Sequence, residues 1–255
     1  MTPNAHFKAR LVARDLMAGC FIKTPHPIVV EVLGASALDF LVLDAEHAPF
    51  DRAAIDACIL AARAVGCPVL VRVPDPGWVL NVLDCGAAGV MVPHVTSPEQ
   101  ARALVAAMRY GPGGRGFAGS TRAAGYGTRP MAEHRAKAQD EVALVCQIED
   151  PEGVDCVEAI AAVPGVDALF LGRADMAVGM GLSDFFAPEL VPVCDRVLAA
   201  PGAATGLFCA PSEDFAPWVA KGASFIVAGS EHSMMSAGAA RLAAARTALL
   251  PRGPQ

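Results

Sequence analysis

Two carboxylates follow separate short apolar runs of this sequence and could together bind a metal ion. Glu149 ends the run ALVCQIE (143–149), and Asp175 follows the run ALFLG (168–172). If these runs are neighbouring strands, the two charges repel one another unless a cation lies between them. Mg²⁺ and Mn²⁺ commonly take one or two protein carboxylates and leave their other positions to water and substrate. From spacing alone, carboxylates that cap helices or form salt bridges are an equally good interpretation, whereas zinc is disfavoured because no His/Cys cluster has ligand spacing.

Arg72 lies at the end of a third apolar run, PVLVRV (68–73). A guanidinium beside a metal site can stabilise a developing oxyanion or bind a carboxylate through two hydrogen bonds. An internal ion pair with a carboxylate such as Asp44 is the structural alternative, and both roles can hold together.

Asp44 and His47 follow the run DFLVLD (39–44) and are three positions apart. A carboxylate that holds an imidazole fixes its tautomer and raises its basicity, which suits a general base near neutral pH. A solvated loop histidine is the alternative. Lys23, which follows the run GCFIKT (19–24), could form a Schiff base, although nothing nearby in the sequence marks it for that role. GPGGRG (111–116) matches a dinucleotide-binding pattern but follows a helical segment rather than a strand, so it predicts only a flexible glycine loop.

These candidates share a position, because each lies at the end of one of eight short apolar runs. The runs are continuously apolar rather than alternating, which is typical of parallel strands covered on both faces. Helical segments between them begin at capping residues or proline and end at glycine. Eight such units in 255 residues predict a single (β/α)₈ TIM barrel over 1–255, with its active site at the carboxyl ends of the strands. A doubly wound Rossmann sheet is the alternative, but GCFIKTPHP (19–27) is not the phosphate loop that it needs. The runs cover 19–24, 39–44, 68–73, 89–95, 143–149, 168–172, 205–209 and 224–229.

Two further segments stand out, and the composition excludes several classes of protein. A Gly/Arg-rich loop is expected over 111–140, beside one end of the barrel, and a C-terminal helix over 233–249.

The chain is 54% hydrophobic with a net charge of −6, so it is not disordered and has no basic footprint for nucleic acid or anionic membranes. Its eight cysteines are scattered without a C-x-x-C pair, which indicates reduced thiols and, with no secretory signal, a cytoplasmic location.

Several motifs, in order along nearly the whole chain, resemble the HpcH/HpaI aldolase family of metal-dependent, class II pyruvate-type aldolases. They are FIKTP, DFLVLDAEHAPFD, VLVRVP, LDCGAAGVMVPHV, RYGPGGRGFAGSTRAAGYG, QIED and VPGVDALFLGRADMA. The resemblance implies a divalent metal (Mg²⁺, Mn²⁺ or Co²⁺) on Glu149 and Asp175. It implies Arg72 at the enolate oxygen and the Asp44–His47 dyad in proton transfer at the aldol hydroxyl.

The resemblance also implies substrate contacts and an assembly. Substrate binding falls to Gln147, Phe208 and the backbone of Gly172, Ala174 and Asp175. Asp84 corresponds to a residue directed toward a neighbouring subunit's site, in a hexamer whose C-terminal helices, here 233–249, pack across subunits. The chain departs from the family at two places. Arg173 stands where proline is common and could touch an acidic acceptor or point to solvent, and the segment 230–232 reads Ser-Glu-His rather than the more usual Ser-Asp pattern.

The expected activity is reversible aldol cleavage of a 4-hydroxy-2-oxo acid to pyruvate, or hydroxypyruvate, and an aldehyde. The alternative is a citrate-lyase-type C–C lyase acting on a CoA thioester, which needs a basic groove that only Arg115, Arg122 and Arg129 could supply. A metabolite-binding barrel without catalysis is disfavoured because both His47 and Arg72 are present. The sequence does not identify the aldehyde.

Overall fold

Eight parallel strands form a closed barrel in the computed structural model, which describes residues 1–249. Each strand pairs with the next along the chain, and the last pairs with the first. This confirms the predicted TIM barrel, and each strand begins within two residues of its apolar run. Residues 250–255 of the predicted domain lie outside the described part. The strands are β1 (Met17–Ile22), β2 (Phe40–Asp44), β3 (Val69–Arg72), β4 (Gly89–Val92), β5 (Ala143–Ile148), β6 (Ala168–Leu171), β7 (Ala204–Cys209) and β8 (Phe225–Ser230).

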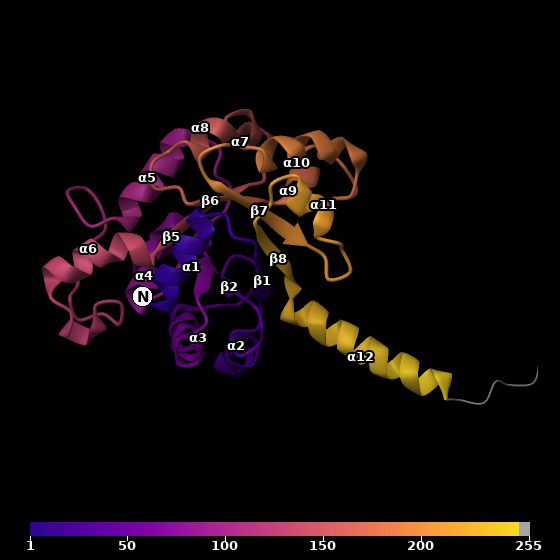
Figure 1. The fold of residues 1–255 in the computed structure, drawn as a ribbon, viewed down its shortest axis with the longest axis horizontal. Coiled ribbons are helices and arrows are strands. Elements are labelled where there is room, and N and C mark those ends of the chain that lie inside the picture. The colour runs from indigo at the N-terminus through magenta and orange to yellow at the C-terminus, as the bar shows by residue number, and fades with distance from the viewer. Residues whose placement is uncertain (250–255) are drawn as a thin grey trace, which may run out of the picture.

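Helices surround the barrel on its outer side, and α1 lies across its amino-terminal end (Figure 1). The capping residues start helices where the sequence predicts them: the side chain of Asp51 accepts from the N–H of Ala54, and that of Ser97 from the N–H of Gln100. The helices are α1 (Pro3–Val12), α2 (Pro27–Gly34), α3 (Arg52–Val65), α4 (Val79–Cys85), α5 (Pro98–Met108), α6 (Met131–Glu141), α7 (Pro151–Asp155), α8 (Val157–Ala161), α9 (Arg173–Gly179), α10 (Val191–Leu198), α11 (Ala216–Ala220) and α12 (Glu231–Ala248).

Aromatic side chains fill the barrel interior, so the barrel is a packed core and not a pore. Phe40 and Phe225 are fully buried and stack with their ring centroids 4.7 Å apart, and Phe170 meets Phe225 at 5.8 Å. Phe7 of α1 closes the amino-terminal end against Phe40. A ligand can therefore reach the barrel axis only from the carboxyl end of the strands, above Phe21 and Phe170.

The segment 111–140 differs from its expectation as one long loop, because α6 occupies its second half. The sequence MAEHRAKAQDE has no apolar stripe, so periodicity gave no signal for this helix. It is nevertheless rich in residues with high intrinsic helix propensity, and only His134 and Ala138 are buried. The glycine-rich half remains irregular, as predicted, and Arg122 anchors it by donating to Asp56.

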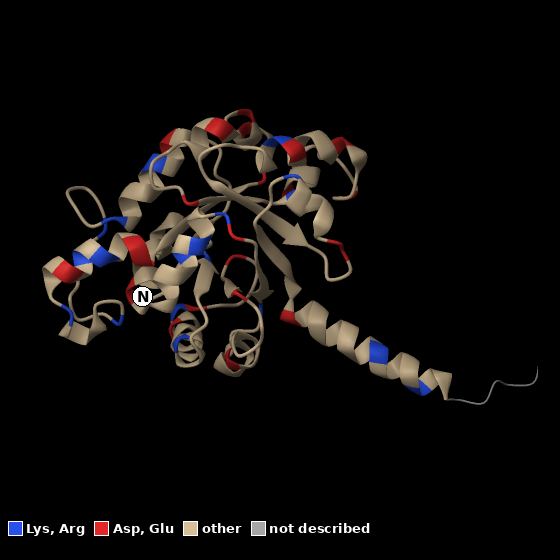
Figure 2. Ribbon diagram, viewed as in Figure 1, with Lys and Arg blue, Asp and Glu red and all other residues tan. Residues whose placement is uncertain are grey.

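The C-terminal helix forms as predicted, as α12, and begins two residues earlier than expected. It leaves the barrel at the end of β8 and extends away from it (Figure 1). Ser230 and Ser233 form a reciprocal capping box at its start. Charged residues are scattered over the helices of the molecule without a basic stretch (Figure 2). Among the described helices, none combines the length and apolarity needed to cross a membrane.

Candidate active site

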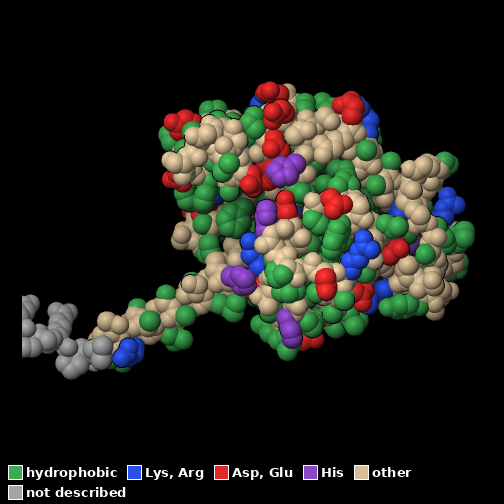
Figure 3. Space-filling view, turned by 180° about the vertical axis from the view of Figure 1, so that it is seen from behind, with side chains coloured by type: hydrophobic (Ala, Val, Ile, Leu, Met, Phe, Trp, Pro, Cys, Tyr) green, Lys and Arg blue, Asp and Glu red, His purple; other side chains and the backbone are tan. Residues whose placement is uncertain are grey.

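An open cavity of about 600 Å³ lies at the carboxyl ends of the barrel strands. Acidic and histidine side chains gather at this end of the molecule (Figure 3). The strand register brings Asp44 of β2 level with Arg72 of β3, and Gln147 of β5 level with Phe170 of β6. Most of the residues predicted for the site line this cavity or lie directly beneath it. The lining comprises Phe21, Lys23, His47, Arg72, Gln147, Phe170, Gly172, Arg173, Ala174, Asp175, Phe185, Phe208, Ser230, His232 and Ser233.

Arg72 and Asp44 form a buried ion pair at the ends of adjacent strands. The Nε–H and Nη2–H of Arg72 both donate to Oδ1 of Asp44, at 3.0 and 2.7 Å, and the Asp44 side chain is fully buried. Burial alone would raise the pKa of Asp44, but the charge and hydrogen bonds of Arg72 outweigh it, so this pKa lies below its ordinary value. The guanidinium also lies over the ring of Phe21, with its Cζ 4.6 Å from the ring centroid. Both sequence interpretations of Arg72 are therefore compatible: it is ion-paired and it faces the cavity.

The contact between Asp44 and His47 is not the expected carboxylate–imidazole bond. Oδ1 of Asp44 accepts the backbone N–H of His47 at 3.1 Å. The imidazole instead lies near Glu46, with Nε2 3.6 Å from Oε2, and its side chain is half exposed at the cavity. Asp44 has turned toward Arg72 because a guanidinium offers it two charge-assisted hydrogen bonds. The same Oε2 lies 3.3 Å from Nε of Arg72, so Glu46 stands between the imidazole and the guanidinium.

Lys23 extends from the end of β1 toward the same carboxylate. Its Nζ lies 3.3 Å from Oδ2 of Asp44. A lysine that forms a Schiff base attacks as the free amine, whereas Lys23 is engaged by a carboxylate. The structure gives no support to a Schiff-base role.

Glu149 and Asp175 lie together on the opposite side of the mouth. Glu149 is almost fully buried; its Oε1 accepts the backbone N–H of His94 at 2.9 Å, and its Oε2 accepts from the Gln147 amide. Burial raises the pKa of Glu149, and the negative charge of Asp175 raises it further. A side chain at Gly172 would place its Cβ 2.6 Å from Oε2 of Glu149, so only glycine fits beside this carboxylate.

The donor set at this place suits a hard divalent cation. Within residues 1–249, the buried Oε1 of Gln147 has no hydrogen-bond partner, and two neighbouring carboxylates repel each other. A cation would relieve both costs, and oxygen ligands are those that Mg²⁺ and Mn²⁺ prefer. No group of three His, Cys, Asp or Glu side chains forms a fuller metal site in the described chain. The chain thus supplies only part of a coordination shell and leaves positions for water and substrate.

Glu231 organises the mouth and was not predicted from the sequence. Its carboxylate is buried and accepts the backbone N–H groups of Lys23, at 2.8 and 2.9 Å, and of Thr24, at 2.6 Å. His232 adds a contact from Nε2 to Oγ1 of Thr24 at 2.9 Å. The first turn of α12 therefore fixes the loop that carries Lys23. The sequence feature that pointed to this segment was Ser-Glu-His at 230–232, which differs from the Ser-Asp pattern more usual in the family.

Arg173 neither points to solvent nor offers a free charge to an acidic acceptor. Its side chain is 3% exposed, and Nη2 donates to the carbonyl of Phe208 at 2.8 Å and to Oε2 of Glu213 at 2.7 Å. The ring of Trp218 lies 4.7 Å from its guanidinium carbon. Arg173 thus connects the loop after β6 to the loop after β7.

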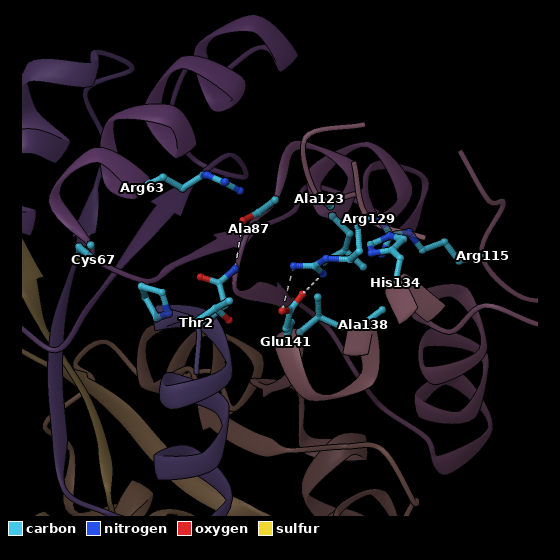
Figure 4. A pocket seen from close by; sticks show the side chains of 16 residues that line it. Thr2, Arg63, Cys67, Ala87, Arg115, Ala123, Arg129, His134, Ala138 and Glu141 are labelled. Carbon is cyan, nitrogen blue, oxygen red and sulfur yellow. Dashed lines mark hydrogen bonds and ion pairs between the residues drawn. The ribbon is translucent and has the colours of Figure 1, made fainter. Parts of the chain in front are cut away.

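Asp84 lies far from this mouth, near the end of α4 at the amino-terminal side of the barrel. It pairs there with Arg115. Arg115 also lines a second cavity of about 200 Å³, where Arg129 is paired with Glu141 (Figure 4). Asp84 therefore does not line the cavity of its own chain.

Comparison with known proteins identifies the family. Residues 17–237 match the family model described as HpcH/HpaI aldolase/citrate lyase. The chain belongs to this family. Proteins named 5-keto-4-deoxy-D-glucarate aldolase from Klebsiella pneumoniae and Shigella dysenteriae are 36% and 35% identical, each over 94% of this chain and 96% of the relative. Membership of the HpcH/HpaI family confirms the predicted aldolase-type lyase.

Solved structures agree with this assignment. An HpcH/HpaI aldolase/citrate lyase family protein from Burkholderia cenocepacia superimposes with a TM-score of 0.89 at 33% identity, covering 95% of this chain and 99% of that one. A citrate lyase beta subunit from M. tuberculosis has a TM-score of 0.57 at 18% identity, covering 86% of this chain and 93% of that one. At that identity the likeness shows the fold alone.

Proposed function

We propose that this chain catalyses the reversible, divalent-metal-dependent aldol cleavage of a 4-hydroxy-2-oxo acid to pyruvate, or hydroxypyruvate, and an aldehyde. The observation that carries the proposal is the placement of Glu149, Asp175 and the unpartnered Gln147 oxygen at the same mouth as Arg72. Loss of the aldehyde leaves an enolate, and this mouth is arranged to hold that negative charge. The names of the similar relatives support the reaction class.

Glu149 and Asp175 would hold the metal, with Gln147 beside them. Mg²⁺, Mn²⁺ and Co²⁺ all fit such oxygen donors. When bound, the ion supplies Lewis-acid stabilisation of the charge that develops on the substrate oxygen.

Four parts of the chain would handle the donor half of the substrate. The guanidinium of Arg72, held in place by Asp44, donates toward the enolate oxygen. The N–H groups of Ala174 and Asp175 lie in the first turn of α9, where a helix leaves its N–H groups without intrahelical partners, and would bind the substrate carboxylate. Gly172 allows the close approach, and Phe208 bounds the cavity on the β7 side.

His47 would move the proton of the C4 hydroxyl. Its imidazole lines the cavity, is half exposed and has Glu46 beside it. In cleavage it takes the hydroxyl proton as the C3–C4 bond breaks, and in synthesis it returns the proton to the new alkoxide.

We propose a hexamer in which α12 packs across subunits and Asp84 approaches a neighbouring site. The exposed apolar side chains of Met235 and Leu242 on the extended α12 favour such packing.

We also propose that the enzyme works in the cytoplasm, which the eight free cysteines support.

Among residues 1–249, the three arginines that the CoA-thioester alternative requires are all paired with carboxylates. Arg115, Arg122 and Arg129 are paired with Asp84, Asp56 and Glu141. No observation favours this second function.

The test is a cleavage and synthesis assay with pyruvate and hydroxypyruvate as donors against a panel of aldehydes. EDTA should abolish turnover, and added Mg²⁺, Mn²⁺ or Co²⁺ should restore it. If borohydride with pyruvate traps a covalent adduct on Lys23, or if EDTA leaves turnover unchanged, the metal-dependent mechanism is wrong.

A further inference from the structure

The loop that follows β4 contains a residue with an unusual backbone conformation. His94 has a φ of 53°, in the left-handed region, and in residues 1–249 only Arg14 and Tyr126 share this feature among the non-glycine residues. A side chain makes this conformation costly, because its Cβ lies close to the following carbonyl oxygen. Contacts on both sides of His94 must therefore hold its backbone in this conformation.

This conformation directs the backbone N–H of His94 at the buried carboxylate of Glu149. The N–H donates to Oε1 of Glu149 at 2.9 Å. The other oxygen, Oε2, faces the amide of Gln147 and the backbone of Gly172. Because a carboxylate is planar and rigid, a fixed donor on Oε1 also fixes the direction of Oε2. Carboxylates that bind metals are commonly oriented by such hydrogen bonds from groups outside the coordination shell.

Gln100, in the first turn of α5, locks the other side of His94. Its Nε2 donates to the carbonyl of His94 at 3.1 Å, and its Oε1 accepts the N–H of Thr96 at 2.9 Å. The intervening N–H, that of Val95, donates to the carbonyl of Gln147 at 3.1 Å. The peptide groups before and after the Cα of His94 are therefore both fixed by hydrogen bonds, so neither of its dihedral angles can change without breaking one of them.

The imidazole of His94 has a separate and more exposed contact. Its Nδ1 lies 3.0 Å from Oδ2 of Asp150 and 3.5 Å from Oε1 of Glu149, and the side chain is 58% exposed. His94 is also absent from the residues that line the cavity. The buried contact with Glu149 is thus made by the backbone, whereas the side chain lies largely in solvent. This separation allows the two contributions to be distinguished by substitution.

We propose that His94 is a positioning residue that orients Glu149 for the divalent cation through its backbone N–H, and that Gln100 holds His94 in the conformation this requires. The inference rests on the metal-dependent function proposed above, because it assigns both residues to the support of a metal ligand. Without the N–H, a buried carboxylate oxygen would lose its hydrogen bond, which is costly. Glu149 would then be free to turn, and binding of the cation would have to fix it again.

The first test is a series of substitutions at position 94, in which Mn²⁺ is titrated into the metal-free full-length protein and binding is followed by calorimetry and paramagnetic resonance. His94→Val should raise the Mn²⁺ dissociation constant about tenfold or more, because a β-branched residue disfavours positive φ. His94→Asn and His94→Gly should retain most of the affinity, because both residues adopt positive φ readily. Unchanged affinity in His94→Val overturns the inference. A loss in His94→Gly as large as that in His94→Val also overturns it, because the imidazole would then be the important group.

The second test examines Gln100 and leaves position 94 intact. Gln100→Met keeps the length of the side chain but removes both of its hydrogen bonds to the loop, so it should weaken Mn²⁺ binding in the same direction as His94→Val. This variant decides the question if His94→Val does not fold. Gln139→Met, on the exposed side of α6, is the matched control and should bind Mn²⁺ normally. Wild-type affinity in Gln100→Met shows that α5 does not act on Glu149 and overturns the inference.

A control for backbone strain comes from Arg14, which has a φ of 60° in the exposed loop after α1. Arg14→Val introduces the same kind of strain as His94→Val but lies at the amino-terminal end of the barrel. It should lower thermal stability and leave Mn²⁺ affinity unchanged. If His94→Val behaves in the same way, His94 is only structural and the assignment is wrong. If the wild-type protein itself binds no Mn²⁺, the proposed function and this inference fail together, whereas equal binding by wild type and all variants removes this inference alone.

Discussion

Arg72 donates two N–H groups to a single oxygen of Asp44, at 3.0 and 2.7 Å. The guanidinium is held against the floor of the cavity in one orientation, with its remaining N–H groups available. A donor that is fixed before reaction needs no reorganisation when charge develops on the substrate. The pair therefore links a structural ion pair to the proposed stabilisation of the enolate.

Arg72→Ala should lose both aldol cleavage and the exchange of pyruvate methyl protons, because both pass through the enolate. Removing one positioned oxyanion donor typically lowers the rate by roughly 10²–10³. Near-wild-type proton exchange in this variant, measured by NMR in deuterated water, would contradict the role. Arg52→Ala, which removes an exposed arginine stacked over Trp78, is a suitable control.

His47→Ala should slow aldol cleavage by about 10²–10⁴, the usual range for a positioned acid–base group. Oxaloacetate decarboxylation should be affected much less, because it needs no deprotonation of a hydroxyl. Equal losses in the two reactions would show that His47 shapes the site instead.

Asp44→Asn should resemble Arg72→Ala rather than His47→Ala, because the carboxylate holds the guanidinium and not the imidazole. We expect both cleavage and decarboxylation to fall together. Selective loss of cleavage alone would restore the Asp44–His47 dyad as the working unit. Glu46→Gln should affect both reactions as well, because Oε2 of Glu46 lies 3.3 Å from Nε of Arg72 and 3.6 Å from Nε2 of His47.

Glu149→Gln and Asp175→Asn should each weaken Mn²⁺ binding by about tenfold or more, since even residues outside the coordination shell matter by 10–100-fold. Direct titration by calorimetry or by Mn²⁺ paramagnetic resonance measures this without turnover. Glu152→Gln, an exposed carboxylate on α7, should bind Mn²⁺ normally. Unchanged affinity in both site variants would remove these residues as ligands.

Acid should destabilise the fold partly through Asp44. Its folded-state pKa is lowered, so its stabilising contribution is fully present above the unfolded-state pKa of about 3.9 and is lost as the pH falls through the folded value. Urea unfolding of metal-free protein should show a smaller stability loss between about pH 6 and pH 3 in Asp44→Asn than in wild type. Asp140→Asn, on the exposed side of α6, should behave as wild type. Parallel losses in all three proteins would show that other groups govern acid unfolding.

The barrel could be predicted from the sequence because strands that are buried on both faces are continuously apolar. The run that forms β5 is an example, since all six of its residues are buried. The same rule places Arg72 and Glu149 at the mouth, since each follows such a run. Sequence spacing could not predict the hydrogen-bond partner of Asp44. The backbone N–H of His47, the imidazole of His47 and the guanidinium of Arg72 were all possible donors to that carboxylate. Arg173 and its partner Glu213 are 40 positions apart in the sequence, and Glu231 and its partner Lys23 are 208 positions apart. No local sequence pattern predicts such contacts.

Helix α6 illustrates a different limit. It packs only His134 and Ala138 into the molecule, so its hydrophobic pattern is almost absent and intrinsic propensity alone would have found it. The glycine-rich half of the same segment was recognisable, because glycine repeats mark irregular backbone directly.

The carboxylate that fixes the loop of Lys23 and Thr24 belongs to the first residue of α12. Removing α12 to test the proposed assembly therefore also changes the loop at the cavity. A stop codon placed before Glu231 removes all of α12 and also releases the loop of Lys23 and Thr24. A stop codon placed after the first turn of α12 removes the rest of the helix and leaves Glu231 in place. Kinetic differences between these two truncations would separate the effect of losing the proposed subunit contacts from the effect of releasing the loop of Lys23 and Thr24.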